Sequence, residues 1–181
     1  MAIVRPLECG VVDAADPREQ KRAIASVFTR TSATHDTVGT PLFAHFGQML
    51  VDRAELAAGE RVLDVAAGTG ATLFPTARRV GHGGRVVGID LAPGMIDRLR
   101  AEISARGSSN AEARVADAEE LPFGDESFDV VLCGEQERHH TGRKASLVSR
   151  CHALTPCEVL ILPNPGKHLE SLGRVGNPEL H

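Results

Sequence analysis

Short apolar runs recur along the chain and alternate with longer segments whose apolar residues follow helical spacing. The runs occupy residues 62–64, 85–89, 113–116, 129–133 and 159–162. Runs of this length, separated by helical segments, are typical of the strands of a parallel sheet. The pattern therefore predicts an α/β fold with one open parallel sheet.

The segments between these runs predict the helices. Residues 71–80 and 93–106 follow the first two strands, and Gly107 can close the second of these helices. Residues 142–154 carry apolar side chains at helical spacing and predict a helix before the fifth strand.

Two further helices are expected before the first strand. Asp16 can cap a helix that begins at Pro17, since aspartate favours the cap and proline the first turn. Residues 29–40 are polar and contain a glycine, so they predict a loop, and residues 41–56 predict the second helix. We expect both helices to cap the crevice beyond the strand ends.

Three of the predicted strands end in an aspartate. Asp64, Asp90 and Asp117 are 26 and 27 residues apart, and each interval fits one strand–helix unit. The carboxyl ends of parallel strands share one edge of the sheet, where ligands of open α/β sheets bind. Gly68 and Gly70 follow the first strand and suit a tight turn that a ligand can approach closely. A ligand rich in hydroxyl and amino groups would match these acceptors.

The segments VLDVAAGTG, VVGIDLAPGMIDRL and ADAEELPFGDESFDVVLC resemble the class I S-adenosylmethionine-dependent methyltransferases, in particular the branch that includes the ubiquinone/menaquinone C-methyltransferases. The likeness covers about residues 28–162, and LPFGDESFDVVLC is its most specific part. It implies a Rossmann-like sheet with strand order 3-2-1-4-5 and S-adenosylmethionine as cofactor. It also implies in-line methyl transfer to oxygen or carbon of a small-molecule acceptor. Residues 1–57 would form the capping helices and lid, and residues 58–181 the donor-binding domain.

The resemblance also assigns roles to residues. Asp64 would reach toward the amino-acid end of the donor, Asp90 would accept both ribose hydroxyls, and Asp117 would accept the adenine amino group. The full donor-binding set implied is Asp64, Ala66, Gly68, Thr69, Gly70, Asp90, Leu91, Met95, Asp117, Ala118 and Cys133. The alternative for Asp64 and Asp117 is a strand-end carboxylate that caps the next turn, and for Met95 it is a core position.

A nicotinamide dinucleotide fold is the main alternative on the same architecture. Its fingerprint G-x-G-x-x-G needs a third glycine, which residues 66–73 lack. Asp90 would serve either cofactor, because both contain a ribose, whereas Asp117 followed by Ala118 favours the methyl donor.

The catalytic residues are less clearly indicated. The sulfonium methyl is activated by the cofactor itself, so positioning carries much of the rate. His139 and His140 follow the fourth strand and are candidate bases, with a solvated loop position as the alternative. His35 is a second candidate, in a place where relatives tend to carry tyrosine. The histidines and cysteines of residues 133–157 match no zinc spacing, so we predict no metal site.

The C-terminal part departs from the family pattern. Residues 135–138 are charged where relatives are apolar, and Cys157 and Glu158 stand in place of two glycines. The sequence ends roughly 20 residues after the fifth strand, whereas the full family fold adds two more strands. The alternative function is therefore a truncated or decayed homologue that binds the donor without catalysis or serves as a partner subunit.

Composition narrows the function classes further. The chain has 181 residues, is 42% hydrophobic and has no apolar run near 18 residues, so we expect no membrane span. A net charge of −4 and the absence of Trp and Tyr argue against nucleic-acid binding. The N-terminus lacks the pattern of a secretory signal, and the cysteines lack C-x-x-C spacing, so a cytoplasmic location is expected. The sequence indicates neither the acceptor nor the oligomeric state.

Overall fold

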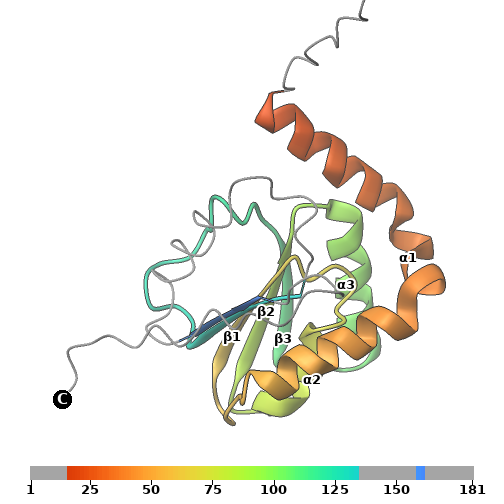
Figure 1. Cartoon of the computed structure of the whole chain (residues 1–181). Helices are drawn as coiled ribbons and strands as arrows, with labels where there is room; N and C mark the ends of the chain where they lie inside the picture. Colours follow the sequence, from red (N-terminus) through yellow and green to blue (C-terminus); the bar gives the residue numbers. More distant parts are fainter. Residues whose placement is uncertain (1–15, 135–157, 162–181) are drawn as a thin grey trace, which may run out of the picture.

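The computed structural model describes residues 16–134 and 158–161. Its elements are α1 (Pro17–Arg53), β1 (Arg61–Val65), α2 (Leu73–Val80), β2 (Arg85–Asp90), α3 (Pro93–Ala105), β3 (Ala111–Val115), β4 (Val130–Cys133) and β5 (Glu158–Ile161) (Figure 1). Within these residues, five parallel strands form one sheet in the order β3-β2-β1-β4-β5. The predicted α/β class, the Rossmann-like open sheet and the strand order are confirmed.

The central strand β1 is buried between two parallel neighbours. Asp64 of β1 lies opposite Gly88 of β2 and Leu132 of β4. Nearly every position of β1, β2 and β4 is buried. Strands covered on both faces need apolar side chains on both, which explains why these segments read as continuous apolar runs.

Each face of the sheet has its own hydrophobic core. On one face, α1, α2 and α3 pack on the strands through residues such as Leu50, Leu73 and Leu99 (Figure 1). On the other face, residues 116–128 cover β1, β2 and β4, and the rings of Phe123 and Phe128 meet edge to face at 5.0 Å. The long loop after β3 is therefore part of the core.

The predicted loop over residues 29–40 is wrong. The structure has one helix of 37 residues in place of two helices with a loop between them. Two of the polar residues that suggested a loop donate their hydroxyl groups inside the helix. Thr31 bonds back to the carbonyl of Val27, and Ser32 to that of Thr29. The predicted start is confirmed, since Asp16 accepts the backbone N–H of Arg18 at 3.1 Å.

Smaller differences concern the ends of elements. The helix α2 begins at Leu73, two residues later than predicted, because residues 66–72 are needed for the turn. Strand β3 spans Ala111–Val115 and lies at the edge of the described sheet. The predicted helix 142–154 and any strands after β5 lie outside the described residues. In the described part of the chain, no helix is long and apolar enough to cross a membrane.

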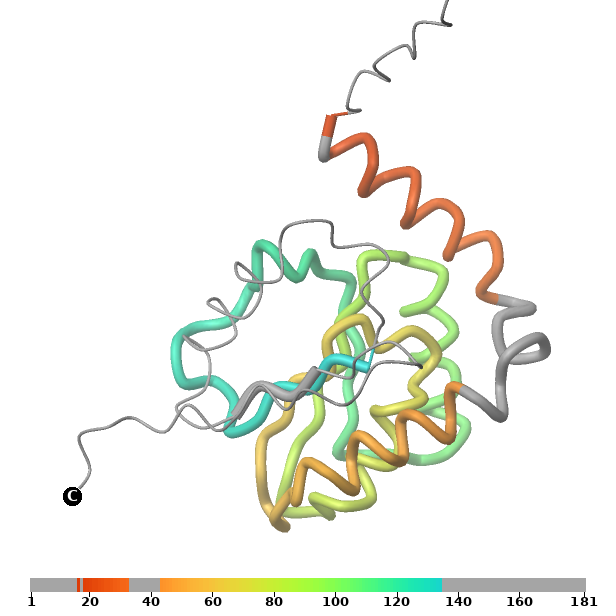
Figure 2. Tube along the Cα trace, viewed as in Figure 1, coloured from red at the N-terminus to blue at the C-terminus, as the bar shows by residue number. Residues whose placement is uncertain are grey.

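Helix α1 lies against the beginning of α3. A side chain on Gly94, in the first turn of α3, would meet the carbonyl oxygen of Thr29 at 2.8 Å, so only glycine allows this approach. The hydroxyl of Thr29 also faces the backbone N–H of Gly94 at 3.4 Å. Figure 2 shows the N-terminal half of α1 passing close to this end of α3. Because α3 begins directly after β2, this half of α1 lies near the carboxyl edge of the sheet.

Candidate functional site

Three carboxylates lie along the carboxyl edge of the sheet, as the sequence predicts. Asp64 is in β1, Asp90 ends β2, and Asp117 comes two residues after β3. The three strands are neighbours in the order β3-β2-β1, so the carboxylates follow one another across the edge. What each carboxylate contacts differs, and these contacts decide what the edge can bind.

The turn after β1 is built from residues with positive φ. Ala66, Gly68 and Gly70 have φ of 57°, 52° and 98°. Ala66 therefore adopts a left-handed backbone conformation, which costs less free energy for glycine than for alanine. A side chain on Gly70 would meet the ring of Phe74 at 2.6 Å, so this glycine is needed for packing as well as for its backbone angle. The turn leads into α2 with its backbone N–H groups near the sheet edge.

Asp90 ties this turn to the next one. One carboxylate oxygen accepts the backbone N–H of Gly68 at 3.0 Å, and the other accepts that of Ala92 at 2.8 Å. The two bonds fix the carboxylate between the turns that follow β1 and β2. A carboxylate oxygen can accept more than one donor, so these bonds leave Asp90 able to bind ligand hydroxyls.

Asp64 is a buried acid without a hydrogen-bond partner among the described residues. Its side chain is 1% exposed, and neither carboxyl oxygen meets a donor there. Burial, and secondly the charge of Asp90, raise the pKa of Asp64 well above its usual range. An isolated buried carboxyl of this kind is costly unless a ligand supplies a donor or a positive charge.

Asp117 is held by a residue that the sequence did not indicate. Its Oδ1 accepts the backbone N–H of Glu119 at 2.9 Å, and its Oδ2 accepts Lys21 Nζ at 2.6 Å. Lys21 also donates to Glu119 at 2.7 Å, and so α1 is attached to the segment that follows β3. Partial burial lowers the pKa of Lys21, but bonds and charges from Asp117 and Glu119 outweigh it and raise the pKa above its usual value.

The remaining predicted donor-binding residues are spread around the edge. Leu91 and Thr69 are half-buried, in the turns after β2 and β1. Ala118 packs on the core under residues 116–128, while Met95 and Cys133 are 1% and 4% exposed. Met95 and Cys133 thus contribute to the hydrophobic core, whatever else they contact.

The side chains of the candidate catalytic residues are not among those that the structure describes. His139 and His140 lie outside the described residues, and His35 lies within α1 at a position whose side chain is not described. Among residues 16–134 and 158–161, no group of three His, Cys, Asp or Glu side chains is placed to hold a metal ion.

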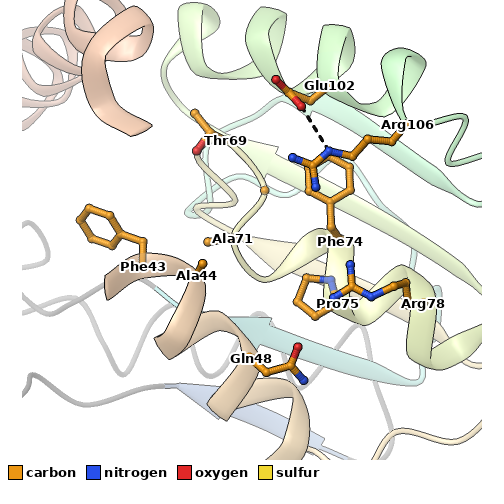
Figure 3. A pocket seen from close by; sticks show the side chains of 11 residues that line it. Phe43, Ala44, Gln48, Thr69, Ala71, Phe74, Pro75, Arg78, Glu102 and Arg106 are labelled. Carbon is orange, nitrogen blue, oxygen red and sulfur yellow. Dashed lines mark hydrogen bonds and ion pairs between the residues drawn. The ribbon is translucent and has the colours of Figure 1, made fainter. Parts of the chain in front are cut away.

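Two hollows lie on the helical face of the described part of the molecule. One has a volume of about 410 Å³ and is lined by α1, α2 and the end of α3, with Phe74, Arg78 and Arg106 among its residues (Figure 3). This hollow reaches the turn after β1, since Thr69 and Gly70 also line it. The other, of about 430 Å³, adjoins it and shares Phe74, Arg78 and Arg106. Neither hollow contains any of the three strand-end carboxylates.

Comparison with known proteins decides the family. A family model described as "Methyltransferase domain" matches residues 62–156, just over half of the chain. The chain belongs to this family. The match begins in β1 and includes the turn and all three strand-end carboxylates. The resemblance to the S-adenosylmethionine-dependent methyltransferases is thereby confirmed.

Individual relatives agree with this assignment. The aklanonic acid methyltransferase DauC of Streptomyces sp. strain C5 is 46% identical over 112 residues, which cover 62% of this chain and 51% of that protein. The ubiquinone/menaquinone biosynthesis C-methyltransferase UbiE of Idiomarina loihiensis is 34% identical over 152 residues, or 80% of this chain and 60% of that one. This methyltransferase-family chain therefore spans between half and two thirds of the length of these relatives.

Solved structures show the same fold. A SAM-dependent methyltransferase from Aquifex aeolicus superposes with a TM-score of 0.61 at 19% identity, covering 84% of this chain and 77% of that one. The cyclase SpnF gives a TM-score of 0.58 at 20% identity, covering 68% and 47%. A fold shared by a methyltransferase and a cyclase does not itself fix the reaction, which must be argued from the site.

Proposed function

We propose that this chain binds S-adenosylmethionine at the carboxyl edge of its sheet and transfers the methyl group to a small-molecule acceptor by in-line displacement. The main support for this proposal is the turn of residues 66–70, which Asp90 fixes through the backbone N–H of Gly68. The turn lies beside Asp64, whose carboxyl has no hydrogen-bond partner among the described residues. Family membership and fold support the same conclusion.

The residues at the edge fit the three parts of the donor. Asp64 would receive the amino-acid end, whose ammonium group supplies the charge and donors that the buried carboxyl lacks. Asp90 would accept the ribose hydroxyls. Asp117 would accept the adenine amino group beside the contact that it already makes with Lys21. Adenine, ribose and amino acid would then follow one another along the edge in the strand order β3-β2-β1.

The cofactor, when bound, supplies a methyl group already activated for transfer. The chain has to hold donor and acceptor in line and exclude water. We propose that residues 1–57 act as the lid of the domain formed by residues 58–181. The contacts of Thr29 with Gly94 and of Lys21 with Asp117 support a lid role for α1.

The names of the relatives suggest the acceptor class. They point to aklanonic acid, ubiquinone and menaquinone biosynthesis, so we propose an aromatic or quinone-like acceptor that is methylated on oxygen or carbon. If the acceptor needs a base, His139 and His140 remain the proposed candidates.

The test combines binding with turnover. Calorimetry with S-adenosylhomocysteine measures the donor site, and mass spectrometry after incubation with S-adenosylmethionine and a panel of hydroxyquinones and phenols measures transfer. Binding with a product 14 Da heavier is the expected result, the mass of one added methylene. Binding without any product across the panel would favour the donor-binding homologue, and no binding would reject the proposal.

A further inference from the structure

The two hollows on the helical face share a wall that carries two arginines. Arg78, in the last turn of α2, and Arg106, which follows α3, line both hollows together with Phe74. The volumes of about 410 and 430 Å³ are each in the range of ordinary small-molecule sites. Neither arginine belongs to the predicted donor-binding set, although the first hollow borders that set at Thr69 and Gly70.

Arg106 is fixed in a geometry that leaves donors available. Its guanidinium lies 3.9 Å from the centre of the Phe74 ring, and its Nε donates to Glu102 at 3.2 Å (Figure 3). Phe74 is buried and Glu102 is partly buried, so they support the guanidinium from one side. The Arg106 side chain is 52% exposed, and no contact in the described part of the chain uses its terminal nitrogens. The outer face of a guanidinium stacked in this way can receive a second flat group.

Arg78 adds a second positive charge that is not neutralised. Within residues 16–134 and 158–161, no hydrogen bond or ion pair uses its exposed guanidinium. Among the described residues, Glu102 is the only carboxylate that lines either hollow, and it is already paired with Arg106. This local excess of positive charge stands out in a chain whose net charge is −4.

Backbone carbonyls at the end of α2 would repel an anion, but two of them already accept hydrogen bonds. Asn110 donates its side-chain amide to the carbonyls of Ala77 and Gly81 at 2.9 and 2.8 Å. Since these groups already accept hydrogen bonds, their repulsion of a nearby anion is reduced.

We propose that the two hollows form a second small-molecule site, which binds a flat aromatic carboxylate. Arg78 would pair with the carboxylate, and the ring would lie on the outer face of the Arg106 guanidinium. This arrangement satisfies the free donors of both arginines and buries the apolar ring in the hollow. The proposal rests on Arg78 and Arg106, which lie outside the proposed methyl-donor set.

Amide NMR of the labelled protein, titrated with 2-naphthoate, tests the site. Saturable shifts at residues 106–110 are expected, with a dissociation constant on the order of 1 mM for a ligand of this size. The neutral 2-naphthamide and inorganic phosphate should each bind at least about tenfold more weakly, because each lacks one of the two recognised features. Equal binding of either probe would overturn the proposal.

Matched variants separate the role of Arg78 from a general effect of positive charge. Arg78→Gln should weaken 2-naphthoate binding about tenfold, whereas Arg79→Gln should change it less than about twofold. Arg79 is a matched control, since it lies beside Arg78 in α2 but donates to the carbonyl of Leu56 and lines neither hollow. Equal losses in both variants would overturn the proposal.

Discussion

At the scale of single residues, the site depends on carboxylates in unlike surroundings. Asp90 holds two backbone N–H groups and organises the turns, whereas Asp64 is buried and has no partner among the described residues. The sequence predicted where these aspartates lie, because each ends an apolar run. It could not predict their contacts, which depend on how neighbouring turns pack.

Replacing Asp90 should weaken the donor site. Asp90→Ala is expected to reduce S-adenosylhomocysteine affinity by about 1.5–3 kcal/mol, the usual range for hydrogen bonds to a charged group. Asp90→Asn should lose less, because the amide still accepts one bond. Calorimetry measures both, and Asp97→Ala, on the exposed side of α3, is the control. Unchanged affinity in Asp90→Ala would show that the ribose assignment is wrong.

Asp64 should make stability and binding depend on pH. The pKa of Asp64 is raised in the folded state. The protonated form therefore stabilises the fold fully below about pH 4, which is the pKa of this carboxyl in the unfolded chain. This stabilisation is lost as pH rises toward the folded pKa. The free energy of unfolding of Asp64→Asn relative to the native chain should therefore increase over this window. Denaturant titrations at several pH values measure it, and a pH-independent difference would contradict the assignment.

The same residue predicts a proton release. If the donor's ammonium group binds beside Asp64, binding should lower the pKa of this carboxyl and release a proton. The calorimetric enthalpy of binding would then change with the ionisation enthalpy of the buffer. Asp64→Asn should abolish this buffer dependence. A buffer-independent enthalpy in the native chain would show that Asp64 does not meet the ammonium group.

At the scale of elements, α1 is attached at two points near the sheet edge. Lys21 pairs with Asp117 and Glu119, which lie 96 and 98 positions further along the chain. Gly94 allows the close approach of Thr29. No local pattern signals contacts of such sequence separation, so the sequence missed Lys21. The predicted loop 29–40 failed for a related reason, because composition suggested a break and helix hydrogen bonding outweighed it.

Removing the Lys21 pair should loosen the N-terminal half of α1. In Lys21→Met, amide hydrogen exchange over residues 18–32 should become faster, and S-adenosylhomocysteine affinity should fall about three- to tenfold, as expected for a partly buried pair. Arg22→Met removes the same charge from the next position and should leave both unchanged. Tighter donor binding in Lys21→Met would show that the pair competes with the donor.

Gly94 tests the contact between α1 and α3. Gly94→Ala places a methyl group 2.8 Å from the Thr29 carbonyl oxygen, and the shift that this forces should cost about 1–3 kcal/mol of unfolding free energy. Gly83→Ala is the control, because its added carbon would meet nothing closer than 3.7 Å. Denaturant unfolding of both variants checks it, and equal stabilities would place α1 elsewhere in solution.

At the scale of the whole molecule, the fold was largely readable from the sequence. Strands β1, β2 and β4 are buried on both faces, so their apolar runs identified them, and the regular spacing of the aspartates gave the strand–helix units. The hollows beside Arg78 and Arg106 were not readable from the sequence, because their walls combine segments that lie far apart along the chain. The chain spans about half the length of its relative DauC. The reaction proposed for this chain therefore rests on the geometry of the sheet edge.

We expect the sheet edge to bind the methyl donor and not a nicotinamide dinucleotide. A calorimetric comparison of S-adenosylhomocysteine with NAD on the native chain distinguishes the two. The turn with its missing third glycine and the unpartnered Asp64 predict that S-adenosylhomocysteine binds at least about tenfold more tightly. NAD binding as tightly as, or more tightly than, S-adenosylhomocysteine would show that the edge is not a methyl-donor site.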